Sequence, residues 1–190
     1  MLYLDNNAAK LLWTYVGMGR HDYPPNRNEM GGLMVGFRLS KTAAVVINMI
    51  PVTNPTVQSH TYLEWSGLEE IVMRRHFYEI QENLAHDNPD AAEKLAILGW
   101  FHTHPSNLPV FMSGTDRANQ AEKYPDGFAL VINPHTMVWK AYYGKNSLEI
   151  PVIMTVPKKE KRPSDYQKNK KRKNQYGLPR GGKKKRKRGR

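Results

Sequence analysis

A short apolar run, residues 95–101, leads directly into the sequence His-Thr-His-Pro. Its length and composition fit a strand that is buried on both faces, which places it inside a sheet and not at an edge. Side chains alternate faces along a strand, so His102 and His104 point to one side while Thr103 points to the other. The sequence therefore predicts an inner strand whose end presents two imidazoles, about 7 Å apart along the backbone.

The remaining residues up to 156 supply helices and further strands around this inner strand. Apolar periodicity and turn signals predict helices over residues 6–17, 64–85 and 113–123. They predict the other strands over residues 30–39, 42–52, 128–132, 137–143 and 148–154, with residues 52–62 as a loop. This order indicates one α/β domain, residues 1–156, with a mixed sheet flanked by helices.

Two features of composition limit the kind of protein and its compartment. The chain has no cysteine, which excludes disulfides, thiolate zinc sites and a cysteine nucleophile. The first residues lack the pattern of a signal peptide, and the apolar stretch 43–52 is interrupted by Asn48 and Pro51, so it is too short to cross a bilayer. We therefore expect no membrane segment and an intracellular, cytoplasmic protein, or a nuclear one if the source is eukaryotic.

The charge of the chain is divided unevenly between its two parts. Residues 158–190 contain 17 Lys and Arg but only two acidic residues, Glu160 and Asp165, so the net charge of this segment is +15. The net charge of the whole chain is +12. The rest of the chain is thus mildly acidic, at about −3. A segment so poor in apolar residues cannot bury enough surface to offset its chain entropy, so residues 157–190 are predicted to be a disordered basic tail.

A carboxylate and a hydroxyl follow the histidine pair at helical spacing. Asp116 lies three residues after Ser113, close to one helical turn, so both side chains can face one site. Two histidines and one aspartate would give a metal ion three protein ligands and leave a fourth position for water. Each element also has an ordinary interpretation: a hydrogen-bonded histidine pair, an N-cap followed by a first-turn acid, and, for Glu29, a charge before a strand.

The order and spacing of these elements resemble the JAMM, or MPN-type, metalloprotease family. The family signature is a distant Glu, then His-Ser/Thr-His-Pro, a spacer and Ser-x-x-Asp; here these are Glu29, residues 102–105 and residues 113–116. Glu29 leads into a Gly-Gly-x-x-x-Gly run, as in family members, and the resemblance covers residues 4–154. One departure is that eight residues separate His104 from Ser113, where the family usually has seven. The extra residue lies in an expected loop, where insertions are tolerated.

This resemblance implies a layered MPN-like domain, of the cytidine-deaminase-like type, with one zinc ion per chain. It implies that His102, His104 and Asp116 hold the zinc, that Glu29 is the general base for a zinc-bound water, and that Ser113 donates to the oxyanion. The implied activity is hydrolysis of an isopeptide or peptide bond. The implied partner is ubiquitin or a ubiquitin-like protein, cleaved at its C-terminus.

Other interpretations remain open at this stage. The chain can instead be a nucleic-acid- or ribosome-associated protein that acts through residues 158–190, or this tail can be a localisation signal or a solvated segment. A bacterial or phage peptidase with another peptide substrate has the same motif. Glu64, Glu69 and Glu70, all expected on the second helix, are competing candidates for the general base.

Overall fold

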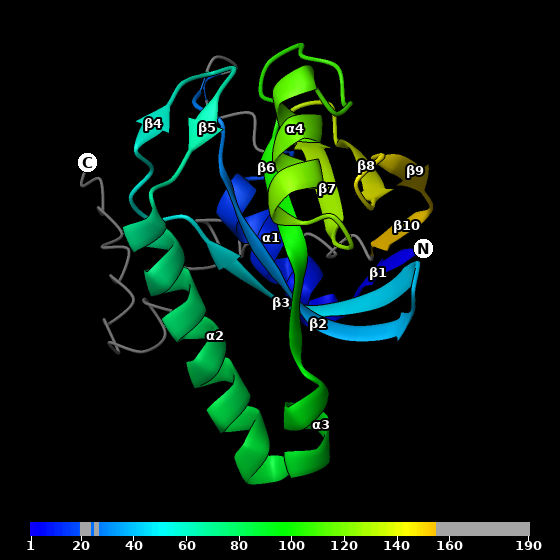
Figure 1. Ribbon diagram of the computed structural model, residues 1–190. Coiled ribbons are helices and arrows are strands. Elements are labelled where there is room, and N and C mark those ends of the chain that lie inside the picture. Colours follow the sequence, from blue (N-terminus) through cyan, green and yellow to red (C-terminus); the bar gives the residue numbers. More distant parts are fainter. Residues whose placement is uncertain (20–23, 25–26, 155–190) are drawn as a thin grey trace, which may run out of the picture. The chain divides into compact units, whose positions relative to one another are not determined.

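The structure is a computed structural model that describes residues 1–19, 24 and 27–154 (Figure 1). Its helices are α1 (Asn6–Val16), α2 (Gly67–Asp87), α3 (Pro89–Lys94) and α4 (Gly114–Lys123). Its strands are β1 (Leu2–Leu4), β2 (Gly31–Ser40), β3 (Ala43–Pro51), β4 (Val57–Gln58), β5 (Leu63–Glu64), β6 (Ala96–Thr103), β7 (Phe128–Asn133), β8 (Val138–Tyr143), β9 (Leu148–Ile150) and β10 (Val152–Met154). All of the predicted helices and strands are present, with bounds that differ by a few residues.

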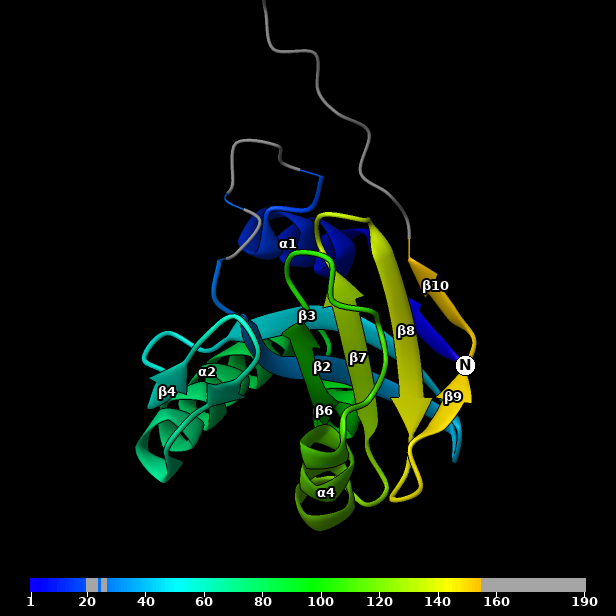
Figure 2. The same ribbon diagram turned by 90° about the horizontal axis from the view of Figure 1, so that it is seen from above.

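Eight of these strands form one mixed sheet in the order β10-β1-β3-β2-β6-β7-β8-β9, while β4 and β5 pair as a separate hairpin. β1 runs parallel to β10 and β3, and β6 runs parallel to β7, whereas the other neighbours are antiparallel. β9 and β10 stand at opposite ends of this order, yet only Pro151 separates them in the chain. The sheet therefore curls until its two edges meet (Figure 2). The predicted α/β class with a mixed sheet is confirmed.

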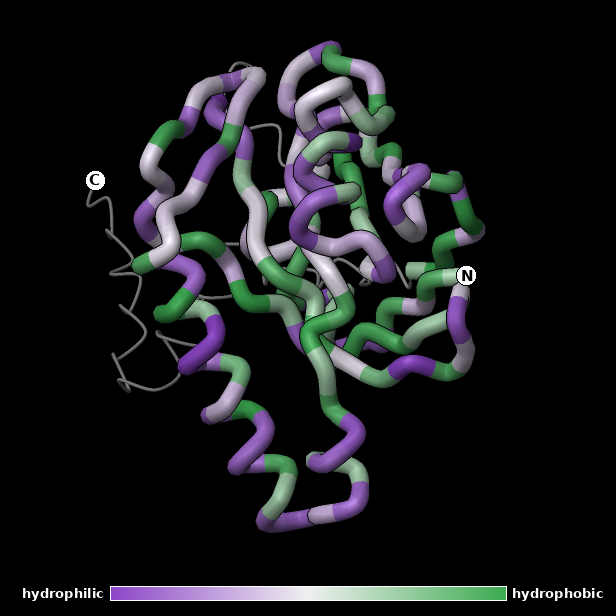
Figure 3. Tube along the Cα trace, viewed as in Figure 1, coloured by the Kyte–Doolittle hydropathy of each residue, from purple (hydrophilic) through white to green (hydrophobic). Residues whose placement is uncertain are grey.

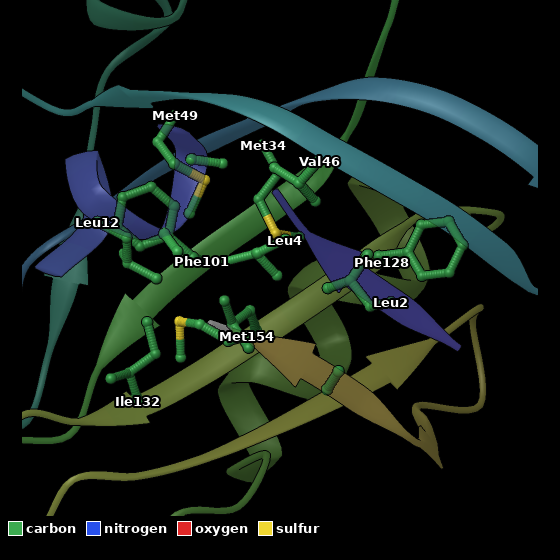
Figure 4. Close-up of a cluster of buried hydrophobic side chains, with 14 of the residues drawn as sticks. Leu2, Leu4, Leu12, Met34, Val46, Met49, Phe101, Phe128, Ile132 and Met154 are labelled. Atoms are coloured by element: carbon green, nitrogen blue, oxygen red, sulfur yellow. The ribbon is translucent and has the colours of Figure 1, made fainter. Parts of the chain in front are cut away.

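Helices cover both faces of the sheet, with α1 on one side and α2 and α4 on the other (Figure 2). The predicted stripe on α1 faces the sheet, since Ala9, Leu12 and Val16 are fully buried. They join a core built largely of side chains from β1, β3, β6 and β7, including Leu2, Leu4, Val46, Phe101 and Ile132 (Figure 4). Each leucine buried there stabilises the fold by roughly 2 kcal/mol.

A second core lies between the opposite face of the sheet and α2. Met73 is fully buried, and Phe77, Ile80 and Leu84 pack against this core, as the apolar stripe of the sequence predicts. The helix alternates between hydrophilic and hydrophobic residues along its length, whereas the strands of the sheet are mostly hydrophobic (Figure 3). This second core supports the face of β6 that carries Trp100.

The inner strand lies where the sequence predicts it, between β2 and β7. Its pairing with β2 shifts register between Met34 and Val35, which indicates a bulge in the ladder next to Gly99. Gly99 has a φ of 149°, and a Cβ there would lie 1.9 Å from the carbonyl oxygen of Phe128. A glycine is therefore required at this position for β6 to pair closely with β7.

Several local features differ from the sequence-based expectation. β1, β5 and α3 were not predicted, because they are too short to show a periodic pattern. Residues 52–62 contain β4 instead of being loop throughout. The last predicted strand is divided at Pro151, because proline cannot donate a ladder hydrogen bond. Asn6 and Asn7 are suitable helix caps by residue type, but the side chain of Asp5 caps α1 by accepting from the amide of Ala8 at 2.7 Å.

In the described part of the chain, no helix is both long and apolar enough to cross a membrane. The basic segment 158–190 lies outside the described residues. The boundary at residue 156 and the disorder of the tail therefore stay predictions.

Candidate metal centre

Three side chains converge at the end of β6, as the sequence motif predicts. The Nε2 atoms of His102 and His104 are 3.1 Å apart. Asp116 Oδ1 lies 3.5 Å from His102 Nε2, and Asp116 Oδ2 lies 3.9 Å from His104 Nε2. All three donors thus lie within 4.8 Å of one another, and both histidines are buried.

This spacing fits a single tetrahedral cation. Zinc–ligand bonds of about 2.0–2.2 Å at a tetrahedral angle place ligand atoms roughly 3.3 Å from one another. The separations of 3.1 Å between the two imidazole nitrogens and 3.5 Å between His102 Nε2 and one oxygen of Asp116 bracket that value. Two imidazoles and one carboxylate are also the donor types that zinc prefers when a fourth position is left open for chemistry.

Neighbouring strands and a helix terminus bring these donors together. The amide of His104 donates to Ile132 of β7 at 2.8 Å, which extends the β6–β7 ladder past the end of β6. Ser113 is the N-cap of α4, and it exchanges hydrogen bonds with Asp116 in a capping box. The ordinary interpretation of this pair and its metal-site interpretation therefore hold together. The cap orients one carboxylate oxygen and leaves the other near His102.

The two imidazoles are held in different ways. His104 Nδ1 lies 2.7 Å from the carbonyl oxygen of Pro109, so Nδ1 is the nitrogen that carries hydrogen and Nε2 presents a lone pair. The ring of His102 stacks on the ring of Trp100, with 4.8 Å between the ring centroids and an interplanar angle of 12°. Trp100 in turn donates from its indole N–H to the fully buried side chain of Gln120 at 2.7 Å.

The sequence analysis did not anticipate the role of Thr103, which points away from the cluster. Its hydroxyl accepts from the amide of Met30 at 2.9 Å, and its own amide donates to the carbonyl of Met30 at 2.8 Å. These two bonds fix the residue next to Glu29 against β6. Only the small hydroxyl residue between the two histidines could have signalled this contact.

Glu29 lies at the cluster, with its side chain 5% exposed. The side chain of Gln58 donates to the carbonyl oxygen of Glu29 at 2.8 Å, and the amide of Glu29 donates to the carbonyl of Ser59 at 2.6 Å. The β4–β5 hairpin therefore holds the backbone of Glu29. Burial, reinforced by the negative charge of Asp116, raises the pKa of Glu29 from 4.5 to about 8. A carboxyl group with this pKa exchanges a proton near neutral pH.

His104 and Asp116 have the protonation states that a cation requires. Burial and the neighbouring His102 lower the pKa of His104, so its imidazole is neutral at pH 7. Burial would raise the pKa of Asp116, but hydrogen bonding and attraction to His102, together with the bonds from Ser113, hold it well below its usual range. Neutral imidazole and ionised carboxylate are the metal-binding forms.

The cluster lies at a cleft of about 230 Å³ that Glu29 and Ser113 also line. The hairpin and the residue after it contribute residues 61–65, and α4 contributes Asn119 and Lys123, followed by its C-cap residue Tyr124. Leu108 and Phe111, from the loop after His104, line it as well. The structure therefore brings all five predicted site residues to one cleft.

The structure also separates the competing carboxylates. Glu64 lines the cleft, but it belongs to β5 and not to the predicted helix, and it accepts from the Tyr62 hydroxyl at 3.2 Å. Glu69 instead accepts bonds from the backbone of the segment after β3, at 2.5 and 3.1 Å. Glu70 pairs with Arg74 at 2.7 Å. Of the competing carboxylates, Glu64 alone lines the cleft.

The raised pKa of Glu29 predicts how the stability of the metal-free protein depends on pH. The unfolded chain loses the proton near pH 4.5, whereas the folded protein keeps it up to about pH 8. Stability therefore falls as pH rises between these values, and Glu29→Gln, which cannot ionise, removes this decline. In EDTA, the melting temperature of the variant should equal that of the parent below pH 4.5 and exceed it increasingly towards pH 8. A constant difference at every pH would contradict the assignment.

The match to a protein-family model agrees with the motif. The model of prokaryotic homologues of the JAB domain matches residues 14–143. Among solved structures, the chain is similar to the crystal structure of a JAB1/MPN domain protein from Archaeoglobus fulgidus, with 15% identity and a TM-score of 0.39. That alignment covers 82% of this chain and 97% of the other. A comparison with curated proteins gives no match. Because the family match spans more than half of the chain and all five site residues, the protein belongs to the family of prokaryotic homologues of the JAB domain.

Proposed function

We propose that the protein is a zinc-dependent metallopeptidase of the JAMM type that hydrolyses an isopeptide or peptide bond. The observation that carries this proposal is the convergence of His102, His104 and Asp116 within 4.8 Å at a cleft that Glu29 also lines. These donors fit one zinc ion, which when bound would supply a Lewis acid that lowers the pKa of water to about 7. Membership in the JAB family supports the same site.

Glu29 is the group that moves the proton. Its carboxyl lies in the cleft beside Asp116, and its pKa of about 8 in the metal-free site would fall when a cation is bound nearby. The ionised carboxylate can then accept a proton from the attacking water and deliver it to the leaving amine. No covalent intermediate with the protein is needed.

Ser113 is the group that stabilises the oxyanion. Its hydroxyl oxygen accepts from the amide of Asp116 at 3.2 Å, which leaves the hydroxyl hydrogen free to donate into the cleft. A donor that faces the developing negative charge is worth about 3 kcal/mol in comparable sites. The N-cap therefore has both a structural and a catalytic task.

The proposed substrate is the C-terminus of ubiquitin or of a ubiquitin-like protein. Such a terminus is an extended chain, and the β4–β5 hairpin supports its recognition because residues 61–65 line the cleft. Within the described residues, β4 and β5 pair only with each other, so each has an edge whose backbone groups can bind another strand. Residues 52–62, which the sequence predicts as a loop, contribute β4 to this hairpin.

The metal assignment predicts about one zinc per chain. Protein purified without added metal should contain zinc, and His104→Ala should lose most of it because one of three donors is removed. Elemental analysis of both proteins at equal concentration measures this. Gln81→Glu, a substitution remote from the cluster, serves as the control and should keep the zinc. An unchanged zinc content in His104→Ala would show that the ligand set is wrong.

The catalytic roles predict a separation of activity from metal binding. Glu29→Gln should keep zinc and fold while reducing amide hydrolysis at least about 100-fold, the usual size of a general-base contribution. Ser113→Ala should reduce it somewhat less. Hydrolysis of ubiquitin-like fusions, measured alongside zinc content, tests both. Full activity of Glu29→Gln would direct attention to Glu64, the other carboxylate at the cleft.

A second candidate function rests on the charge of the chain. Residues 158–190 carry +15, whereas the rest of the chain is mildly acidic. We propose that this segment binds the phosphate backbone of nucleic acid, including ribosomal RNA, without sequence preference. This binding and the hydrolytic site occupy different parts of the chain.

Removal of residues 158–190 should therefore abolish most RNA binding and leave zinc content and peptide hydrolysis in place. In the full chain the logarithm of affinity should fall linearly with the logarithm of salt concentration, over a span of roughly 50 to 300 mM. Equal RNA affinity of the full and shortened chains would rule out the basic segment as the contact.

A further inference from the structure

The last residue of β7, Asn133, is fully buried and follows Ile132, whose carbonyl accepts from the amide of His104. Its side-chain nitrogen donates to the carbonyl oxygens of Ser106 and Leu108, each at 2.9 Å. Its side-chain oxygen accepts from the amides of His135 at 3.0 Å and Thr136 at 2.9 Å. Both ends of the amide are thus engaged, and each end contacts a different segment.

The two ends of this amide serve different purposes. The oxygen closes a local turn after β7, of the kind that asparagine forms with the amides two and three residues ahead. The nitrogen instead reaches the loop that follows the ligand His104, which is distant in sequence. This is the loop that holds the additional residue of the spacer between His104 and Ser113. A turn alone requires only the oxygen.

A short and stiff path connects Asn133 to the imidazole of His104. The carbonyl of Leu108, which Asn133 holds, belongs to the planar peptide that leads into Pro109. The ring of Pro109 fixes φ near −65°, so ψ is the only free torsion before the carbonyl of Pro109. That carbonyl accepts from His104 Nδ1 at 2.7 Å.

We propose that Asn133 is a positioning residue for the metal ligand His104. By holding the loop through Leu108, it directs the carbonyl of Pro109 towards Nδ1 of the imidazole. The hydrogen bond at Nδ1 keeps the Nε2 lone pair facing His102 and Asp116. This inference rests on the metal site of the proposed function and adds a residue from β7 to it.

One substitution separates the two ends of the amide. Asn133→Asp keeps an oxygen for the turn but replaces the donor with an oxygen that repels the carbonyls of Ser106 and Leu108. Zinc affinity, measured by competition with a chromophoric chelator, should fall about 10-fold, the lower end of the effect of losing an outer hydrogen bond at a metal-bound histidine. Circular dichroism of the same samples checks the fold.

A matched control tests whether a new carboxylate alone causes the loss. Gln81 donates from its side chain to the carbonyl of Ala92 at 2.8 Å, in the contact between α2 and α3. Gln81→Glu makes the same chemical change at a place that does not contact the cluster. It should lower the melting temperature and leave zinc affinity unchanged. An equal loss of affinity in Gln81→Glu would overturn the proposal.

A second variant keeps the test decisive if Asn133→Asp does not fold. Pro109 is exposed, so Pro109→Gly preserves packing and releases the fixed torsion between the two carbonyls. It should weaken zinc binding, whereas Asn107→Gly, an exposed position of the same loop, should not. Asn133→Asp and Pro109→Gly both act on the carbonyl of Pro109. The double variant that carries both should therefore bind zinc only slightly more weakly than either single variant. Additive losses would contradict the shared path.

The His104 Nδ1–H signal gives a readout that requires no metal. In nitrogen-15 spectra of the metal-free protein this hydrogen should exchange slowly, and its assignment follows from its loss in His104→Ala. The signal should persist in Gln81→Glu and Asn107→Gly and disappear in Asn133→Asp and Pro109→Gly. If the parent binds no zinc, the proposed function fails while this readout still decides the role of Asn133. If the parent binds zinc and both Asn133→Asp and Pro109→Gly bind it with the same affinity, the role of Asn133 is refuted.

Discussion

The position of β6 between β2 and β7 determines where the two histidines and Glu29 lie. Its antiparallel partner β2 begins two residues after Glu29, and the bonds between Thr103 and Met30 fix that approach. Its parallel partner β7 extends the ladder to His104 and ends in Asn133. One strand thus receives the proposed general base from one side and the support of a candidate metal ligand from the other. A register slip of one residue would turn the histidines away from the cleft.

Charge is concentrated in this cleft at the expense of solvation. Two carboxyl groups, Glu29 and Asp116, share a buried region with two imidazoles. The hydrogen bonds of the α4 N-cap and the neighbouring His102 keep Asp116 ionised, whereas Glu29 has no such compensation and holds its proton. A cation would remove this asymmetry, because it favours the ionised form of both groups. The binding of a cation and the deprotonation of Glu29 are therefore thermodynamically linked.

The sequence predicted the parts of the molecule that depend on local pattern. The apolar stripe on α2 and the inner strand follow from periodicity and alternation, and the five site residues follow from the resemblance of their motif to a known family. The features that it did not predict depend on contacts between distant segments. β1 has three residues and exists because β3 and β10 flank it. Thr103, Gln120 and Asn133 are ordinary polar residues in the sequence, and only the packing of strands and helices gives them partners. The substrate is not encoded in any of these patterns.

The junction at Pro151 has a consequence for the time course of folding. The first and last strands of the domain are neighbours, and Leu2 pairs with Val152, 150 positions along the chain. Closing so large a loop costs chain entropy, and the short pairing of β1 with β10 stabilises the fold only after the loop is closed. This contact is therefore expected to form after the central strands have assembled. An early folding species would hold β2, β6 and β7, with His102 and His104 already in place, while β1 and β10 are still unpaired. The site would then mature before the edge of the sheet closes, and a bound cation could act as a template for the later steps.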